Sequence, residues 1–398
     1  MKICKQQARV YKLFIYSCIL MLPFSWMVFS GVGSVYRAYT IIILLLFLLL
    51  TKFRITISRE NRRLFFYWTL FLVWAGISIM WSMNPESGIT VSFGYMLIFL
   101  ISIVFMVSSD YVDNEKVDDV WLLMGAIWIL LYLVTGRTRF SLSSRTTLII
   151  LGNETDNNEF AGTFVVPVSL MIYEVLHGKS KTKLIVLTAS VLLIIYIVIM
   201  TGSRGGLLAL LIAITVTIFT TTKITMKRFI IILSSVIISI IVINTYIIPV
   251  IPKDILLRFT LDELDSGGYG RTSKWLAAYN MLKDANLFRV LFGYGGFGAM
   301  VLNQTSTMHN QFVQVIMDYG VIGFSFYMLL LTASFRNLWR ENRKYVGAFI
   351  GMMVMCMTIT TGPAYKPLWI FLMMSFLHVG SDSRYFINQC SCEEATRI

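Results

Sequence analysis

The chain alternates between long apolar runs and short polar segments over most of its length. The runs Thr40–Leu50, Leu184–Met200 and Phe229–Val250 carry no charged residue at all. A helix needs about 20 apolar residues to cross the hydrocarbon core of a bilayer. Backbone polar groups in hydrocarbon must form their hydrogen bonds within the same segment. The pattern therefore predicts transmembrane helices rather than strands.

The apolar runs predict about twelve spans of roughly 20 residues each. We therefore expect an all-α polytopic membrane protein with one large outer loop, between the ninth and tenth spans. The expected organisation is 1–248 for spans one to nine, 249–308 for the loop, 309–380 for the last three spans and 381–398 for a tail. The expected spans are centred on residues 13–30, 38–51, 64–81, 89–108, 118–135, 158–176, 184–201, 205–222, 229–248, 309–334, 345–361 and 364–380.

Charge placement predicts the orientation of these spans. Only 14% of the residues are charged, against about 25% in a soluble domain. Lys and Arg cluster in alternate loops, as the positive-inside rule expects, and this places both termini in the cytoplasm. The net charge of +13 lacks the basic stripe with interleaved aromatics that would indicate nucleic-acid binding. The inner clusters are 52–63, 179–183, 223–228 and 336–344.

The cysteines and the first apolar run change this picture little. None of Cys4, Cys18, Cys356, Cys390 and Cys392 lies in the long loop, so the spacing indicates no disulfide framework. Cys390 and Cys392 lack a second pair of ligands, so we expect a reduced tail rather than a metal site. The first apolar run follows basic residues like a signal peptide, but further spans follow at once, which favours a retained anchor.

Three groups of basic residues lie on the predicted outer face, against the topological bias. Arg204 stands between the seventh and eighth spans, and a second group precedes the sixth span. The third group lies in the long loop. Positive charge kept on this side predicts an anionic ligand. The second and third groups are Arg137, Arg139 and Arg145, and then Lys253, Arg258, Arg271, Lys274, Lys283 and Arg289.

The long loop contains its own local structure. Pro249 and Pro252 end the ninth span, and residues 262–270 read as a turn or loop. From Thr272 we expect an amphipathic helix with Trp275 on its apolar face, which suits the membrane interface. The glycines between 293 and 298 then reverse the chain before the tenth span begins at His309.

Arg204 is the first candidate for chemistry. It follows Thr201-Gly202-Ser203 and precedes Gly205-Gly206. A guanidinium at the edge of a membrane is expensive and by default functional, and it can grip phosphate oxygens with two hydrogen bonds. We expect the flanking glycines to let a ligand approach the backbone. The alternative is an arginine in a tight turn whose head group reaches out to water.

Arg271 and Lys274 form a second candidate anion site. They lie one turn apart at the start of the predicted helix in the long loop. The alternative is a solvated helix face, because charge on an exposed helix is ordinary. The polar patch 153–159 could line a substrate groove, but a plain loop is the favoured reading.

His309 is the candidate general base. Of the three histidines, only His309 falls on the predicted outer side; His177 and His378 fall on the inner side. Histidine can take and give protons near neutral pH, so His309 could accept the proton of a sugar hydroxyl. The alternative is an interfacial histidine that caps its helix.

The motifs of common metal and nucleotide sites are missing. We find no His-Glu-x-x-His, no P-loop and no paired outer acidic cluster for Mg²⁺. Asp262, Glu263 and Asp265 lie together in a glycine-rich loop, where loose acidic residues are common. We therefore expect neither a metal nor a cofactor, and arginines to stabilise any phosphate leaving group.

From 153 to 323 the chain resembles the bacterial O-antigen ligase/polymerase superfamily. The resemblance rests on the order of four motifs together with the topology, because no single motif is strongly specific. These motifs are Thr201–Gly206, Gly270-Arg271 with Trp275, Gly293-Tyr294-Gly295, and His309-Asn310-Gln311-Phe312 followed by Asp318–Gly323.

The resemblance implies a GT-C-like glycosyltransferase that acts on an undecaprenyl-diphosphate-linked glycan at the periplasmic face of the bacterial inner membrane. It implies that Arg204 and Arg271 bind the diphosphate and that His309 activates the acceptor hydroxyl. Inversion of configuration without a metal is also implied. Arg145, Lys274 and Asn310 are weaker substrate-binding candidates. The implied partners are the lipid-linked donor, an acceptor glycan or lipid A-core, membrane lipids, a flippase and a chain-length regulator.

Several functions remain open at this point. A polymerase joins lipid-linked repeat units, whereas a ligase transfers the glycan to lipid A-core, and both share these residues; we favour the polymerase. A transporter or flippase would predict repeated halves and charges near the bilayer midplane, which the sequence lacks. A membrane scaffold would use the outer arginines only for anionic lipid headgroups.

Overall fold

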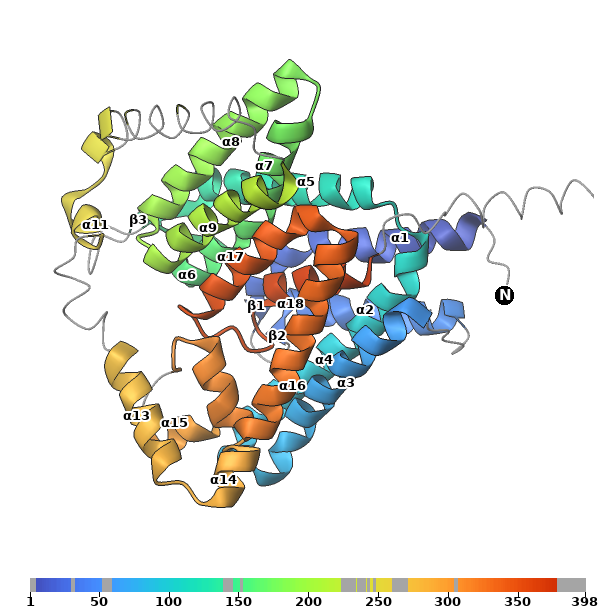
Figure 1. Ribbon diagram of the computed structural model, residues 1–398, viewed down its shortest axis with the longest axis vertical. Coiled ribbons are helices and arrows are strands. Elements are labelled where there is room, and N and C mark those ends of the chain that lie inside the picture. The colour runs from blue at the N-terminus through green and yellow to red at the C-terminus, as the bar shows by residue number, and fades with distance from the viewer. Residues whose placement is uncertain are drawn as a thin grey trace, which may run out of the picture. The chain divides into compact units, whose positions relative to one another are not determined.

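The computed structural model describes residues 5–29, 33–51, 59–138, 146–150, 153–222, 234, 241, 244–245, 248–259, 271–303 and 307–377 (Figure 1). Arg145, residues 260–270 and the tail 381–398 lie outside these ranges, and so does most of the ninth expected span. The following description concerns the described residues.

The described chain is mostly helical. The longest helical segment, α16, has 31 residues and consists of two arms that meet at the non-helical Gly320, where φ is 65°. The rings of Phe312 and Tyr327, one from each arm, lie 6.1 Å apart, so the arms fold back on each other. The helices are α1 (Lys5–Leu20), α2 (Val35–Thr51), α3 (Arg59–Ile77), α4 (Pro85–Ser108), α5 (Asn114–Thr135), α6 (Asn157–Thr163), α7 (Val165–His177), α8 (Lys181–Met200), α9 (Arg204–Thr221), α11 (Lys253–Leu257), α13 (Arg271–Lys283), α14 (Leu287–Phe292), α15 (Gly298–Asn303), α16 (Gln311–Glu341), α17 (Val346–Cys356) and α18 (Lys366–Met373).

Five short strands accompany the helices. They form a two-stranded antiparallel ribbon and a three-stranded antiparallel sheet, with the order β3-β4-β5 in the latter. In register, Val28 pairs with Ser34, Arg137 with Thr147, and Ile149 with Glu154. The strands are β1 (Val28–Phe29), β2 (Gly33–Ser34), β3 (Gly136–Thr138), β4 (Thr146–Ile150) and β5 (Asn153–Glu154).

Seven described helical segments are long and apolar enough to cross a membrane. Val35–Thr51 and Lys366–Phe376 are shorter apolar helices. The chain is therefore a polytopic helical membrane protein, as the hydrophobic pattern predicts, whereas the described residues do not test the expected number of spans. The seven segments are Asn61–Trp81, Pro85–Ser108, Asn114–Thr135, Asn157–His177, Lys181–Met200, Arg204–Thr221 and Gln311–Glu341.

The expected first span, 13–30, is wrong in its bounds. The α-helix ends at Leu20, and a 3-10 turn at Leu22–Trp26 and strand β1 follow it. Pro23 lies at the start of that turn. Proline lacks the amide proton that a continuing α-helix needs, and its ring clashes with the preceding turn. Hydropathy alone did not reveal this break.

The chain divides into two compact units. The first unit comprises Met1–Met124, Ala277–Asn342 and Thr360–Ile398, and the second comprises Gly125–Leu276 and Arg343–Ile359. Two of the boundaries fall inside α5 and α13, and the other two follow α16 and α17. Each unit is described by itself below.

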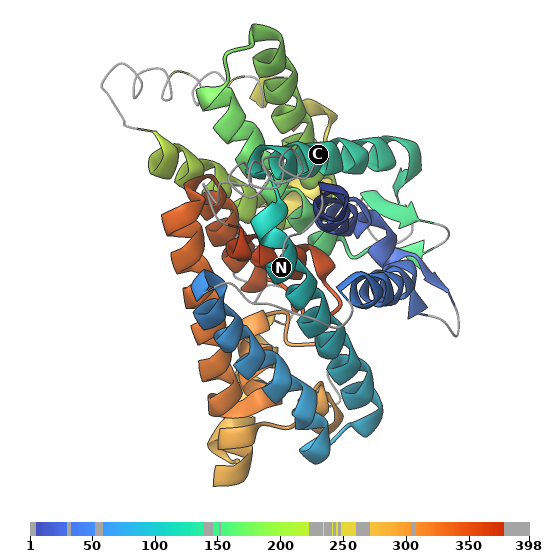
Figure 2. The ribbon, with the colours of Figure 1, turned by 90° about the vertical axis from the view of Figure 1, so that its right-hand side faces the viewer.

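The first unit is built on α3, α4 and α16, and Figure 2 shows α16 alongside α3. Large aromatic side chains from these helices and from α18 are buried against one another. Phe71 stacks on Trp369 with ring centroids 6.2 Å apart, and the buried indole of Trp68 donates a hydrogen bond to Ser334 Oγ at 3.2 Å. Offset and edge-to-face aromatic pairs of this kind stabilise a core beyond simple burial.

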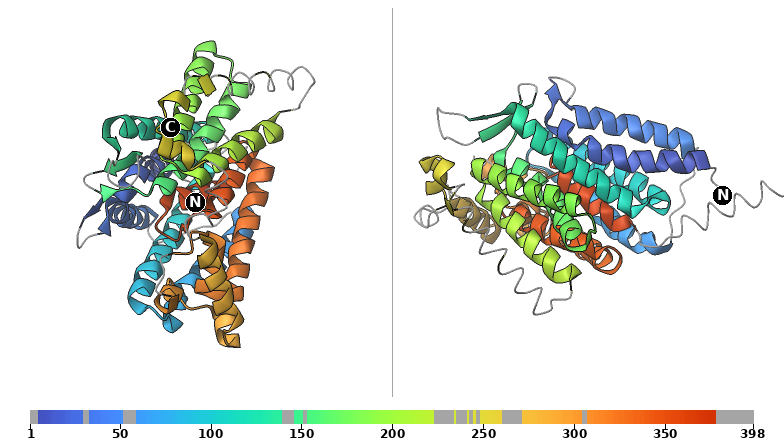
Figure 3. Two further views of the ribbon diagram at one scale, coloured as in Figure 1. Left: turned by 90° about the vertical axis from the view of Figure 1, so that its left-hand side faces the viewer. Right: turned by 90° about the horizontal axis from the view of Figure 1, so that it is seen from above.

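The second unit packs α7, α8, α9 and α17 against one another (Figure 3). Gly347 and Gly351 of α17 lie four residues apart and face α9. A Cβ at Gly347 would overlap Thr217, and a Cβ at Gly351 would lie 2.8 Å from the Cβ of Ala213. Small residues at this spacing let membrane helices approach closely, so that van der Waals contact holds them together.

We expect Gly347→Leu to destabilise the protein by about 1–3 kcal/mol, because overpacking forces neighbouring side chains and backbone to move. Thermal unfolding of the purified protein in detergent measures this effect. Gly76→Leu is the matched control, because a Cβ at Gly76 meets nothing within 4 Å. Equal melting temperatures for the two variants would contradict the close packing of α17 on α9.

Candidate functional site

The turn between α8 and α9 presents Arg204 as the first residue of α9. Gly202 has a φ of 63°, which L-residues with a side chain rarely adopt. Ser203 is the N-cap of α9: its Oγ accepts a hydrogen bond from the Gly206 amide at 3.1 Å. Thr201, Gly202 and Ser203 are buried, while Arg204 is half-buried. The sequence Thr-Gly-Ser-Arg thus encodes a fixed turn with a guanidinium at its edge.

The two glycines after Arg204 have a different role from the one expected. A Cβ at Gly205 would overlap the side chain of Thr358, and one at Gly206 would overlap the side chain of Ala161. Both glycines are buried. They allow α9 to pack against its neighbours, so the expectation that they leave the backbone open to a ligand is wrong.

The polar patch 153–159 holds this turn in place. Asn157 Nδ2 donates to the carbonyl of Thr201 at 3.3 Å, and Ser203 Oγ donates to Asn158 Oδ1 at 3.0 Å. Asp156 caps α6 by accepting hydrogen bonds from the amides of Asn158 and Glu159 at 2.8 and 3.0 Å. The patch is therefore not a plain loop. The atoms named here position the Arg204 turn and do not line a groove.

Arg258 joins the same turn from the start of the long loop. Helix α11 packs through Ile255 on an apolar cluster that includes Ile199 and Ile251. This packing lets Arg258 Nε donate to the Gly202 carbonyl at 3.4 Å. Arg258 is half-buried. The sequence analysis places Arg258 only among the basic residues of the long loop. Its spacing after Pro252 does not predict the hydrogen bond to Gly202.

Arg271 lies in the electrostatic field of both other arginines. It is half-buried at the first residue of α13. Burial lowers the pKa of Arg271, the nearby Arg204 guanidinium lowers it further and Arg258 contributes in the same direction, while the Asp156 carboxylate opposes them. The second unit therefore holds an arginine cluster, Arg204, Arg258 and Arg271. Lys274 is half-buried in the next turn of α13.

His309 lies in the first unit, immediately before α16. Its φ is 48°, a left-handed conformation that is uncommon for a residue with a side chain. His309 is half-buried. The N-cap of α16 is Asn310, whose Oδ1 accepts from the amides of Phe312 and Val313 at 2.9 and 3.2 Å. Asn310, rather than His309, therefore caps the helix, and the expected alternative role of His309 as the cap is wrong.

Buried amide and carboxyl groups on α16 fix the segment that carries His309. Gln314 Oε1 accepts from the Met308 amide at 3.1 Å, and Gln314 Nε2 donates to the Asp318 carboxyl, at 3.0 Å from each oxygen. Gln311 Oε1 accepts from the amides of Thr361 and Gly362 at 2.7 and 2.9 Å. The polar residues 311, 314 and 318 share one face of an apolar helix, and this spacing is the sequence signal that we overlooked.

The glycine turn 293–298, predicted only to reverse the chain, is docked on the same helix. The amides of Tyr294 and Gly295 donate to the carbonyls of Met317 and Asp318 at 2.9 and 2.8 Å. Gly293 and Gly295 have φ of 77° and 79°. Arg289 donates to the carbonyl of Trp81 at 3.0 Å, so this loop cation stabilises the turn instead of adding to the anion site.

The predicted site residues fall into two groups, one in each unit. Arg204, Arg271 and Lys274 belong to the second unit, and His309 and Asn310 to the first. Arg145 lies outside the described residues. No three His, Cys, Asp or Glu side chains in the described ranges come together as a metal-binding cluster.

Comparison with known proteins finds a family to which part of the chain is similar. Residues 189–328 match the family model described as O-antigen ligase. The match includes the arginine cluster and His309, and it confirms the resemblance to the O-antigen ligase/polymerase superfamily, whose members are glycosyltransferase-like membrane enzymes. The chain is thus a polytopic membrane protein in which residues 189–328 are similar to this family.

Curated proteins and solved structures add little to this assignment. No curated protein matches the chain. One similar solved structure is described as "Structural coordination of polymerization and crosslinking by a peptidoglycan synthase complex". Its chain is 13% identical, with a TM-score of 0.45, and the similarity covers 78% of this chain and 96% of that one.

The cap at Asn310 yields a test of its role. We expect Asn310→Ala to lower stability by about 1 kcal/mol, because two amides of α16 lose their acceptor. Asn310→Asp keeps an oxygen that accepts both hydrogen bonds, so its thermal unfolding should match the wild type. Glycan synthesis should follow stability in both variants. If Asn310→Asp is stable but inactive, the side-chain amide contacts substrate and the purely capping role is wrong.

Proposed function

We propose that the protein polymerises oligosaccharide repeat units carried on undecaprenyl diphosphate, at the outer face of the bacterial inner membrane. The observation that carries the proposal is the arginine cluster on the family-matched stretch. A flippase that delivers the donor and a regulator of chain length are the partners that such a reaction implies.

The arginine cluster supports a diphosphate ligand through its charge. Three guanidinium groups held within mutual electrostatic reach repel one another, and partial burial strengthens the repulsion because water screens it less. Hydrogen bonds hold the Arg258 side chain and the backbone of the Arg204 turn in place, so these two arginines start from fixed positions. An anion with several oxygens would relieve this repulsion and accept paired hydrogen bonds.

In the proposed reaction His309 acts on the acceptor hydroxyl as a general base. The imidazole takes the hydroxyl proton while the oxygen attacks the anomeric carbon of the donor sugar. The bond from that carbon to the diphosphate oxygen breaks, its electron pair leaves with undecaprenyl diphosphate, and the configuration inverts. His309 afterwards returns its proton to solvent.

Arg204, Arg258 and Arg271 stabilise the leaving group in this scheme. Negative charge develops on the bridging oxygen as the glycosidic bond breaks. Fixed positive charge in a partly buried site stabilises that charge more than water would, because the groups need not reorganise. Lys274 and Asn310 remain weaker candidates for sugar or phosphate contact, and Arg145 is a further candidate from the sequence alone. We propose that the reaction requires no metal.

The His309 step is tested by glycan display in cells that lack their own copy and carry His309→Asn. Asparagine tolerates the left-handed backbone of position 309, so this variant removes the imidazole while keeping the turn. We expect polymer to fall by at least about 100-fold, the usual contribution of a general base. His309→Ala adds backbone strain and should also lower the amount of inserted protein.

The gel pattern separates the two family activities. Single repeat units on lipid A-core would identify a polymerase, and long chains stranded on undecaprenyl diphosphate would identify a ligase, in which case the proposed polymerase is wrong. A wild-type ladder from normally inserted His309→Asn would instead refute the base.

The diphosphate role of the cluster is tested by Arg204→Gln, Arg258→Gln and Arg271→Gln. Each should weaken donor use by about 10-fold or more, since a charge-assisted hydrogen bond contributes about 1.5–3 kcal/mol. Lys283→Gln is the matched control, an exposed cation at the far end of α13. Turnover of a synthetic lipid-linked donor by purified protein gives the comparison. Losses of equal size in the control would show that only net loop charge matters.

A further inference from the structure

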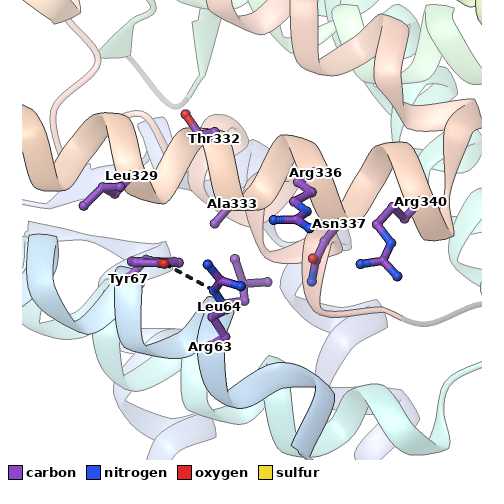
Figure 4. Close-up of a pocket in the computed structure, with 9 residues that line it drawn as sticks. All are labelled: Arg63, Leu64, Tyr67, Leu329, Thr332, Ala333, Arg336, Asn337 and Arg340. Carbon is purple, nitrogen blue, oxygen red and sulfur yellow. Dashed lines mark hydrogen bonds between the residues drawn. The ribbon is translucent and has the colours of Figure 1, made fainter.

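A second group of arginines lines a groove between α3 and α16 within the first unit. The groove has a volume of about 330 Å³. Arg63 and Tyr67 line it from α3, and Arg336 and Arg340 line it from α16, with Leu329 and Ala333 also on α16 (Figure 4). We call this space, with its three arginines, the arginine groove.

The groove is a consequence of helix periodicity. Arg63 and Tyr67 are four residues apart, so they share one face of α3. Leu329, Ala333, Arg336 and Arg340 follow the three- and four-residue spacing of one face of α16. The two helices are held together beside the groove by the hydrogen bond from Trp68 Nε1 to Ser334 Oγ. Two facing stripes therefore enclose the space.

The charge in the groove is positive and unopposed by described carboxylates. Arg63 Nε donates to Tyr67 Oη at 3.3 Å, which orients its guanidinium along α3. Arg63, Arg336 and Arg340 form no ion pair with a carboxylate among the described residues. All three are exposed. No described carboxylate pairs with these three solvated guanidinium groups, so they suit the phosphate of a ligand.

The other half of the groove is apolar. Leu64 forms part of its wall, and Leu329 is 43% exposed on the same stripe of α16, about two turns before Arg336 and three before Arg340. The groove thus changes from charged to apolar along the helix axis. A ligand that matches this gradient has an anionic head and a hydrocarbon tail.

The arginine groove lies on the second arm of α16 and shares no residue with the segment that carries His309. The backbone of Gly320 is not helical, and the rings of Phe312 and Tyr327 lie 6.1 Å apart, so the two arms of α16 fold back on each other. Arg336 follows Tyr327 by nine positions, which corresponds to about 14 Å of helix at 1.5 Å per residue. The groove is lined only by residues 63–67 of α3 and 329–340 of α16, so it is separate from the proposed glycosyl-transfer site.

We propose that the arginine groove binds the phosphate headgroup of an anionic phospholipid. Phosphate oxygens accept hydrogen bonds from Arg63, Arg336 and Arg340, while an acyl chain lies along Leu329 and Ala333. Basic pockets between membrane helices recognise anionic lipids through this combination of charge and apolar wall. The inference does not depend on the reaction catalysed.

Lipid binding is tested with the purified full-length protein in nanodiscs of phosphatidylcholine with increasing phosphatidylglycerol or cardiolipin. Retained lipid is measured by native mass spectrometry and the melting temperature by thermal unfolding. We expect retained anionic lipid and a higher melting temperature than in phosphatidylcholine alone. Each of Arg63→Gln, Arg336→Gln and Arg340→Gln should lower lipid affinity by about fivefold, as one lost cation near a lipid surface predicts.

Arg62→Gln is the matched control, because Arg62 is exposed on α3 beside Arg63 but does not line the groove. It should keep wild-type lipid affinity. Equal losses in Arg62→Gln and the groove variants would reduce the effect to general surface charge and overturn the proposal. Variants that have the melting temperature of the wild type in phosphatidylcholine are folded, so a loss of lipid binding by them is due to the missing arginine of the groove.

Free anions separate the two sources of phosphate. Inorganic phosphate or glycerol 3-phosphate, added to phosphatidylcholine nanodiscs, should not reproduce the stabilisation by anionic lipid. If either does so at matched concentration, the groove is a soluble-phosphate site and the lipid proposal is wrong. Equal binding of phosphatidylcholine and phosphatidylglycerol would also overturn it, because the arginines would then add nothing.

Discussion

The first unit depends on the pairing of buried backbone amides at the start of α16. Non-helical backbone at membrane depth is tolerated only where protein groups satisfy it. Gln311 and Gln314 supply those groups: one accepts from the turn at Thr361 and Gly362, and the other links the Met308 amide to Asp318. Two glutamines of one helix thereby fix the backbone on either side of His309 and the turn after α17. These hydrogen bonds offset the free-energy cost of the left-handed backbone at His309.

The second unit holds like charges near one another, in the cluster of Arg204, Arg258 and Arg271. Arg204 is presented by a buried turn whose carbonyls are already engaged by Asn157 and Arg258. Arg271 is brought into the same field at the start of a separate helix. Tight packing at Gly205 and Gly206 holds the turn in place. Such a fixed turn suits the diphosphate that we propose as its ligand, because the positive charge need not reorganise.

Helix α16 carries chemistry of different kinds at its two ends. Its first turns present polar groups that order the His309 segment, and its last turns present arginines beside an apolar stripe. The kink at Gly320 separates these regions. The glycine turn 293–298 docks next to that kink through the carbonyls of Met317 and Asp318. The first arm of α16 thus orders the His309 segment, and the second arm carries the arginine groove.

Hydropathy and charge placement alone determined the helical membrane class, because a bilayer leaves a chain few other ways to satisfy its backbone. Motif order indicated the resemblance to the superfamily and made Arg204, Arg271 and His309 the candidate site residues. Only the tertiary structure revealed Arg258, the Asn157–Thr201 contact and the packing role of Gly205 and Gly206. These features depend on contacts between residues 44 to more than 150 positions apart, which no local pattern encodes. The helix break after Leu20 and the cap at Asn310 are both local features. Hydropathy does not show the break, because the residues around it are apolar, and the cap lies beside His309, to which the sequence analysis gave that role as an alternative.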